Sequence, residues 1–204
     1  TLVKQNHLSL PMKSEDVIFT AQGKRAGTIV SMSKSVAGAG TVQKAITEER
    51  AEFADREQRI YRHSCKILGG RKFLRQQLSS RSDVHFAIVR GIPYGSLLHL
   101  VAQMQELKEV DIVKVLGISA RTLRRQSEAP DKPMPIDLAS KTWLFAEILA
   151  KATEIFGSKE DAELWVSKPA MGLDGQRPID LLQTVQGAEL VNDFLGRLEY
   201  GVYT

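Results

Sequence analysis

The sequence predicts an all-α protein. Apolar residues recur every three or four positions through most of the chain after residue 42, which is the period of one face of a helix. Serine or proline stands where several of these stretches begin, and glycine stands where several end. No segment shows the sustained alternation of apolar and polar residues that is typical of a half-buried strand. At 204 residues, 43% hydrophobic and 25% charged, the chain has the composition of a globular protein with a substantial core.

Residues 1–41 are predicted to form a flexible basic arm or linker. They have no sustained apolar period, and glycine is frequent, most clearly in Ala37-Gly38-Ala39-Gly40. Their cations are Lys4, Lys13, Lys24, Arg25 and Lys34. Such an arm could cling to DNA or to a partner, but a poorly ordered terminus is the favoured interpretation.

Residues 42–134 are predicted to form a helical N-terminal region. Its first helix, over about 42–62, carries only a thin apolar stripe, so we expect it to need a partner chain to hold it. Ser96 opens a strongly periodic helix that leads into a helix-turn-helix unit over about 96–128.

The helix-turn-helix prediction rests on residues 111–126. A short apolar helix stops at Gly117, where glycine readily takes the positive φ that ends a helix. Ser119 is a ready N-cap for a second helix, with Leu123 on its inner side. Arginine, threonine and glutamine can bind phosphates or base edges in a major groove. The expected DNA-binding residues are therefore Ser119, Arg121, Thr122, Arg124, Arg125 and Gln126.

An ordinary antiparallel helix pair with a solvated basic face is the alternative. Val113 is bulky at a position where helix-turn-helix units usually carry a small residue. If the unit does bind DNA, we expect a homo-dimer or higher assembly, because one recognition helix covers too little DNA for tight specific binding.

Residues 135–204 are predicted to form a second helical domain. Its longest helix, over about 136–156, ends at Gly157, and Ser158 starts the next one. A last helix carries Val191, Phe194 and Leu195 toward the core. The carboxylates Glu160, Asp161 and Glu163 are interpreted as charges at a helix start.

The charges of the two regions have opposite signs. Residues 1–130 hold 21 Lys and Arg against 12 Asp and Glu, a net +9, and residues 131–204 hold 7 against 12, a net −5. Two partners are indicated, a polyanion for the first region and a basic protein surface for the second, unless the unevenness is chance.

A lone Cys65 excludes an intrachain disulfide, and it is interpreted as a buried or half-buried residue without a catalytic role. We expect a cytoplasmic protein with no membrane segment, cofactor, metal site or catalytic residues.

The C-terminal motifs resemble the C-terminal domain of the Xre/MbcA/ParS antitoxins. The matching residues are Trp165-Val-Ser-Lys-Pro169, Leu173-Asp-Gly175-Gln-Arg-Pro178-Ile-Asp180-Leu181-Leu182, Gly187, Val191, Leu195 and Tyr200-Gly201-Val202-Tyr203. Upstream, Leu68-Gly69-Gly70, Arg90-Gly91-Ile92-Pro93 and Arg121-Thr122-Leu123-Arg124-Arg125 also match, so the resemblance covers about residues 64–204. Asp174 departs from the family, which usually has a second glycine there.

The resemblance implies a type II antitoxin paired with a RES-domain toxin that attacks NAD or transfers ADP-ribose from it. Such an antitoxin binds its toxin through the C-terminal domain and represses its own promoter. The expected toxin-binding residues are Arg197, Tyr200, Gly201, Val202 and Tyr203. A dimeric helix-turn-helix transcription regulator without a toxin partner is the alternative function.

Overall fold

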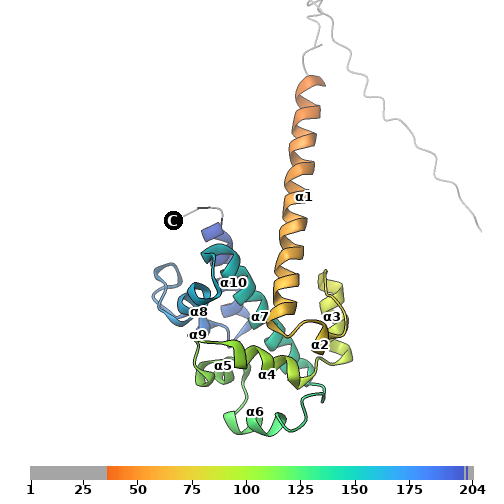
Figure 1. The fold of residues 1–204 in the computed structure, drawn as a ribbon. Helices are drawn as coiled ribbons and strands as arrows, with labels where there is room; N and C mark the ends of the chain where they lie inside the picture. The colour runs from red at the N-terminus through yellow and green to blue at the C-terminus, as the bar shows by residue number, and fades with distance from the viewer. Residues whose placement is uncertain (1–35, 200, 202–204) are drawn as a thin grey trace, which may run out of the picture. The chain divides into compact units, whose positions relative to one another are not determined.

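The computed structural model describes residues 36–199 and residue 201, with side-chain surroundings from residue 42 onward. The chain divides into two units, residues 1–43 and residues 44–204, and the second unit carries the packed helices (Figure 1). Every regular element in the described residues is helical, and none is a strand, which confirms the all-α prediction. The elements are α1 (Val36–Ile67), α2 (Arg71–Leu74), α3 (Arg81–Arg90), α4 (Tyr94–Gln103), α5 (Glu109–Leu116), α6 (Ala120–Gln126), α7 (Ile136–Phe156), α8 (Lys159–Ser167), the 3₁₀ helix η1 (Met171–Leu173), α9 (Pro178–Leu181) and α10 (Val185–Glu199).

Helix α7 is the helix around which residues 44–199 are packed. Ten of its residues are buried, and Phe145 and Ile148 are almost fully enclosed. It contacts α3 and α5 from the N-terminal half of the chain and α8 and α10 from the C-terminal half. The buried residues from Tyr61 to Leu195 form one hydrophobic cluster. The predicted boundary at residues 134/135 therefore falls inside a shared core.

Two predicted helix starts differ from the structure. Helix α1 begins at Val36 rather than Val42, so Ala37-Gly38-Ala39-Gly40 is helical and not part of a linker. Alanine is the strongest helix former and offsets the poor propensity of the glycines. Helix α4 begins at Tyr94, after Pro93, and Ser96 lies buried inside its first turn. The predicted arm otherwise falls on residues 1–35, which lie outside the described residues.

Two absences hold for the described residues. No helix there is both long and apolar enough to cross a membrane. In that same part of the chain, no group of three or more His, Cys, Asp or Glu side chains is placed to hold a metal ion.

Gly187 sets the close approach of α9 and α10. A β-carbon at this position would collide with the carbonyl oxygen of Leu181, a backbone atom that cannot rotate away. The α9–α10 turn is also held by Thr184, whose hydroxyl oxygen accepts a 3.1 Å hydrogen bond from the Gly187 N–H. Glycine is needed here for space rather than for a positive φ.

We predict that Gly187→Ala destabilises the protein by about 1–3 kcal/mol, because the two helices must separate to admit the methyl group. Gly196→Ala in the same helix is the matched control, since no atom lies within 4 Å of its added β-carbon. The control should be neutral or stabilising by up to about 1 kcal/mol through higher helix propensity. Thermal and urea unfolding measure both changes, and equal stability of the two variants would contradict the packing argument.

Candidate functional site

The α5–α6 pair has the turn that the sequence predicts. Gly117 lies in the left-handed region at φ 68°, and its N–H donates back to carbonyl oxygens of α5. Ser119 then caps α6, because its Oγ accepts a 3.0 Å hydrogen bond from the Thr122 N–H. Val113 is buried in the core with Leu123 of α6. The bulky valine is thus accommodated without disturbing either cap.

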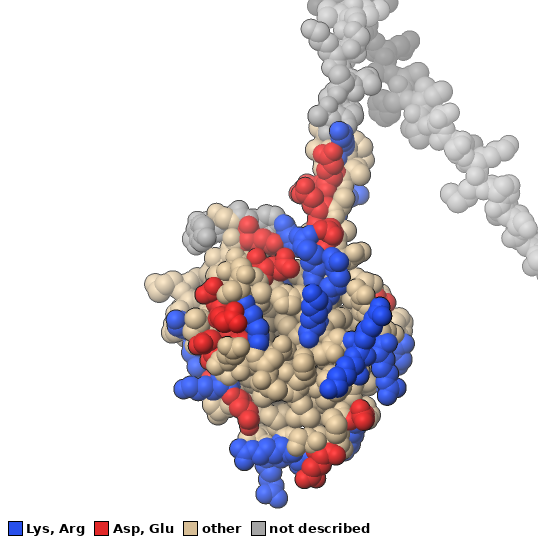
Figure 2. Space-filling model, viewed as in Figure 1, with Lys and Arg blue, Asp and Glu red and all other residues tan. Residues whose placement is uncertain are grey.

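Helix α6 presents three arginines to solvent. Arg121, Arg124 and Arg125 are all exposed, and no carboxylate pairs with them in the described part of the chain. Figure 2 shows a group of basic side chains over α6, at the foot of the molecule. Ser119 is exposed beside them, and its hydroxyl lies 2.9 Å from the half-buried hydroxyl of Thr122. This outer face is a compact, positively charged and rigidly capped surface.

Gln126 is a correction to the predicted set. It is only 6% exposed and lies on the inner side of α6, three residues after the buried Leu123. Residues three apart share one helix face, so Gln126 belongs with the core residue and not with the arginines. It is therefore withdrawn from the expected DNA contacts.

Glu163 joins α8 to the segment that precedes α5. Its side chain is 1% exposed, and one carboxylate oxygen accepts hydrogen bonds from the backbone N–H groups of Gln105, Glu106 and Leu107 at 2.8, 2.8 and 3.3 Å. The other oxygen lies 3.5 Å from the Lys159 ammonium. The interpretation of Glu163 as a helix-start charge was therefore wrong. Glu160 and Asp161, in contrast, do stand in the first turn of α8.

A second polar contact ties α5 to the α9 region. The Arg177 guanidinium contacts Asp180 at 2.7 Å and Asp111 of α5 at 3.2 Å, and Lys114 of α5 also reaches Asp180 at 3.2 Å. The hydrogen bond from Arg177 is the largest of the effects that hold the pKa of Asp180 below its ordinary value of 3.8. The orientation of α5, and with it α6, is thus fixed from the C-terminal part of the chain.

The last helix turns its apolar face inward, as predicted. Val191 and Leu195 are buried, and Phe194 stacks on Trp165 of α8 with ring centroids 6.3 Å apart. Arg197 is exposed, and its guanidinium lies 5.4 Å from the centre of the Phe194 ring. Gly201 is exposed at φ 65°. The expected contacts Tyr200, Val202 and Tyr203 lie outside the described residues.

The turn between α8 and α9 explains why glycine suits position 174. Asp174 has φ 53°, a left-handed conformation that costs most residues about 1–2 kcal/mol and that aspartate tolerates better than most. Gly175 follows at φ 71°. Aspartate at position 174, in place of the glycine that is usual in the family, therefore preserves the backbone conformation of the turn.

Comparison with known proteins identifies the family. Residues 151–201 match the antitoxin Xre/MbcA/ParS C-terminal toxin-binding domain. The antitoxin Xre of Yersinia enterocolitica (serotype O:8 / biotype 1B) is 32% identical over 108 residues, which cover 52% of this chain and 70% of the relative. The chain belongs to the Xre/MbcA/ParS family of antitoxins.

Two further relatives extend the match. The antitoxin Xre of Pseudomonas putida KT2440 is 29% identical over 125 residues, 61% of this chain and 76% of the relative. The antitoxin Xre of Photorhabdus laumondii is 24% identical over 147 residues, 71% of this chain and 98% of the relative. As a member of an antitoxin family, the protein is not an enzyme.

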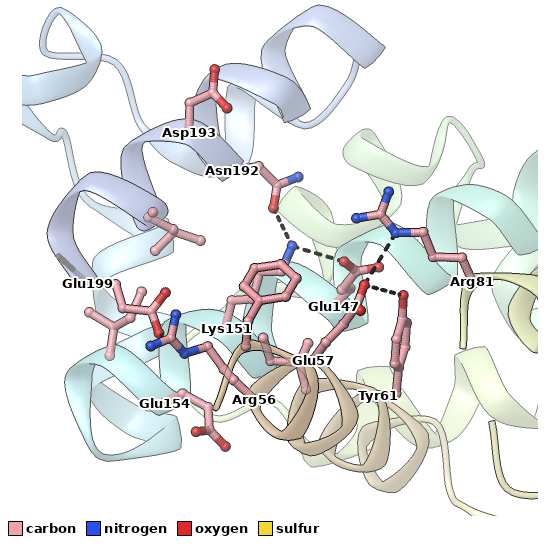
Figure 3. A pocket seen from close by; sticks show the side chains of 15 residues that line it. Arg56, Glu57, Tyr61, Arg81, Glu147, Lys151, Glu154, Asn192, Asp193 and Glu199 are labelled. Atoms are coloured by element: carbon pink, nitrogen blue, oxygen red, sulfur yellow. Dashed lines mark hydrogen bonds and ion pairs between the residues drawn. The ribbon is translucent and has the colours of Figure 1, made fainter. Parts of the chain in front are cut away.

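The sequence did not predict the groove between α1, α7 and α10 (Figure 3). Lys151 contacts Glu147 and Asn192 at 2.9 Å each, and Arg56 contacts Glu199 of α10 at 2.8 Å. Burial is the largest effect that raises the pKa of Tyr61 to about 12, followed by the negative charge of Glu57 and Glu147. The lining holds three cations, all of them in ion pairs, against five carboxylates, and the pair of Arg56 with Glu199 joins α1 to α10.

We predict that Asp180→Asn lowers stability at neutral pH by no more than about 1 kcal/mol, since the pair is partly exposed. A lowered pKa means that ionised Asp180 contributes stability above pH 4, and that this contribution is lost as pH falls through the lowered value. Thermal unfolding at pH 7 and pH 3 should therefore show a larger difference between variant and parent at pH 7 than at pH 3. Asp193→Asn is the control, because Asp193 has no ion pair within the described structure, and a pH-independent difference for Asp180→Asn would contradict the assignment.

Proposed function

We propose that this antitoxin inhibits a cognate RES-domain toxin, which consumes NAD or transfers ADP-ribose, and represses its own operon. The toxin-binding domain at residues 151–201 implies a cognate toxin. The resemblance of the C-terminal motifs to antitoxins of RES-domain toxins supports that class of partner. A regulator without a toxin partner would have no use for such a domain, so the antitoxin function is favoured.

The exposed arginines of α6 are the observation that supports DNA binding most directly. Arg121, Arg124 and Arg125 lie on one short helix whose start is fixed by the Ser119 cap. Leaving three like charges together without a carboxylate partner is unfavourable for the free protein, and phosphate or guanine would relieve it. Because one such helix reads few base pairs, the repressing form would be a homo-dimer or a larger assembly.

We predict that changing Arg121, Arg124 and Arg125 together to alanine abolishes binding to the antitoxin's own promoter. A single arginine that forks onto a guanine should cost ~1–3 kcal/mol and relax specificity at one base pair. Gel shift and fluorescence anisotropy with promoter DNA measure both effects. Arg50→Ala, on the exposed part of α1, is the control, and unchanged promoter binding by the triple variant would exclude α6 as the reading helix.

The outer end of α10 is the proposed toxin-binding surface. Val191 and Leu195 are buried against the protein's own core, so they are unavailable to a partner. Arg197 and Gly201 are exposed, and Tyr200, Val202 and Tyr203 continue the same stretch of sequence. Tyrosine and arginine are the residue types that most often dominate interface energies. We therefore assign inhibition to residues 197–203.

We predict that deleting residues 200–204 releases toxicity while leaving the fold and DNA binding intact. Arg197→Ala should weaken the toxin complex by ~2 kcal/mol if this arginine is a dominant contact. Growth and NAD content on co-expression with the toxin encoded beside the antitoxin are the measurements. Deleting residues 1–35 is the control and should leave inhibition of the toxin unchanged. Continued growth of cells with the 200–204 deletion would exclude these residues as the inhibitory surface.

A further inference from the structure

The cations of the described structure differ in whether a carboxylate neutralises them. In the groove between α1, α7 and α10, Arg56 pairs with Glu199 and Lys151 pairs with Glu147, and Arg81 pairs with Glu57. Six exposed cations around α2 and α3 have no such ion pair within residues 42–199, and all of them except Lys72 line a hollow. These five form what we call the α2–α3 basic surface: Arg62, Lys66, Arg71, Arg75 and Arg90.

The five cations surround two adjoining hollows. Arg62, Lys66 and Arg71 line one hollow of about 190 Å³. Arg75 and Arg90 line a second hollow of about 410 Å³, where Asp131 is the single carboxylate of the lining. Gln76 lines both hollows, which makes the surface continuous. Five positive charges against one negative charge leave a strongly electropositive face.

This surface continues into the segment that leaves α6. Asp131 and Pro133, a few residues after α6, line the larger hollow. The same segment is fastened to the start of α4, since the Gly95 N–H donates to the Pro130 carbonyl oxygen at 2.7 Å and the Met134 N–H donates to Ile92 at 2.8 Å. In Figure 2, basic side chains over α6 are accompanied by a second group on the side of α2 and α3. The two basic groups therefore belong to one rigid part of the protein.

We propose that the α2–α3 basic surface binds the phosphate backbone of the DNA duplex that α6 reads. This inference rests on the proposed DNA binding and adds a second surface to it. Unpaired arginines and lysines bind phosphate oxygens strongly, and arginine can do so through two parallel N–H donors. Phosphate contacts carry no sequence information, so this surface contributes affinity and salt dependence, while α6 contributes the choice of operator.

The test measures how affinity for promoter DNA and for an unrelated duplex falls with salt. Two surface variants are made, Arg75→Asn with Arg90→Gln, and Arg62→Gln with Lys66→Gln and Arg71→Gln. Asparagine is chosen at position 75 because the backbone there is left-handed at φ 60°, which asparagine tolerates. Arg50→Gln with Lys168→Gln removes two exposed cations that have no ion pair in the described structure and lie outside this surface, and it is the matched control. Thermal unfolding checks that all variants are folded.

Each lost phosphate contact should reduce the slope of log K against log salt by about one. The slope should thus fall by about two in the double variant and by about three in the triple variant. Between 50 and 200 mM salt, the DNA affinity of the double variant should therefore drop roughly tenfold less than the affinity of the parent. The preference for promoter over unrelated DNA should stay as in the parent. An unchanged slope, or an equal fall in the control, would overturn the proposal.

The same measurements separate DNA binding by α6 from phosphate binding by the α2–α3 basic surface. If the α6 arginine variant loses promoter preference while the surface variants keep the parent's slope, α6 reads DNA and only the α2–α3 basic surface is excluded. If the parent binds neither duplex, the DNA-binding part of the proposed function fails first. If the surface variants keep the slope but weaken the toxin complex, an acidic protein occupies this surface and the DNA proposal is overturned.

Discussion

The buried carboxylate of Glu163 is the interaction on which the placement of the α5–α6 pair depends. Removing a carboxylate from water is costly unless it is hydrogen-bonded or paired; here three consecutive backbone N–H groups bind one oxygen, and the Lys159 ammonium faces the other. Those N–H groups belong to residues 105–107, immediately before α5. Helix α8, within the matched toxin-binding domain, thus holds the segment from which α5 starts. Arg177 adds a second attachment through Asp111, so α5 is held at its first turn from two sides.

The sequence predicted the features that are encoded within a few residues of each other. The Gly117 turn, the Ser119 cap and the inward Val191 and Leu195 follow from helical period and capping chemistry. The role of Glu163 could not be predicted, because its partners lie 56 to 58 residues away in sequence. The local sequence of a carboxylate near the start of a helix is the same whether its side chain faces water or a buried loop.

Gln126 and the basic surface illustrate a second limit. The position of Gln126 at the end of a basic helix suggests a base contact. In the structure, Gln126 lies with Leu123 on the buried face of α6. Likewise, the charge count of residues 1–130 does not reveal which cations a carboxylate neutralises. That distinction depends on pairs such as Arg56 with Glu199, whose members lie at opposite ends of the described chain. A charged surface that is available to a partner can therefore be identified only from the folded structure, which shows which charges are already paired.

The same contacts define how the two proposed surfaces can influence each other. Helix α9 contacts α5, α8 and α10, so it connects the α5–α6 pair with the helix that carries the proposed toxin contact. The large apolar core around α7 is shared by both regions and cannot be repacked for one of them alone. Polar contacts such as Arg177 with Asp111 and Asp180 can exchange partners at a much smaller cost. Because these charged contacts can rearrange and the α7 core cannot, a movement of α10 would reach α5 more easily through α9 than through α7.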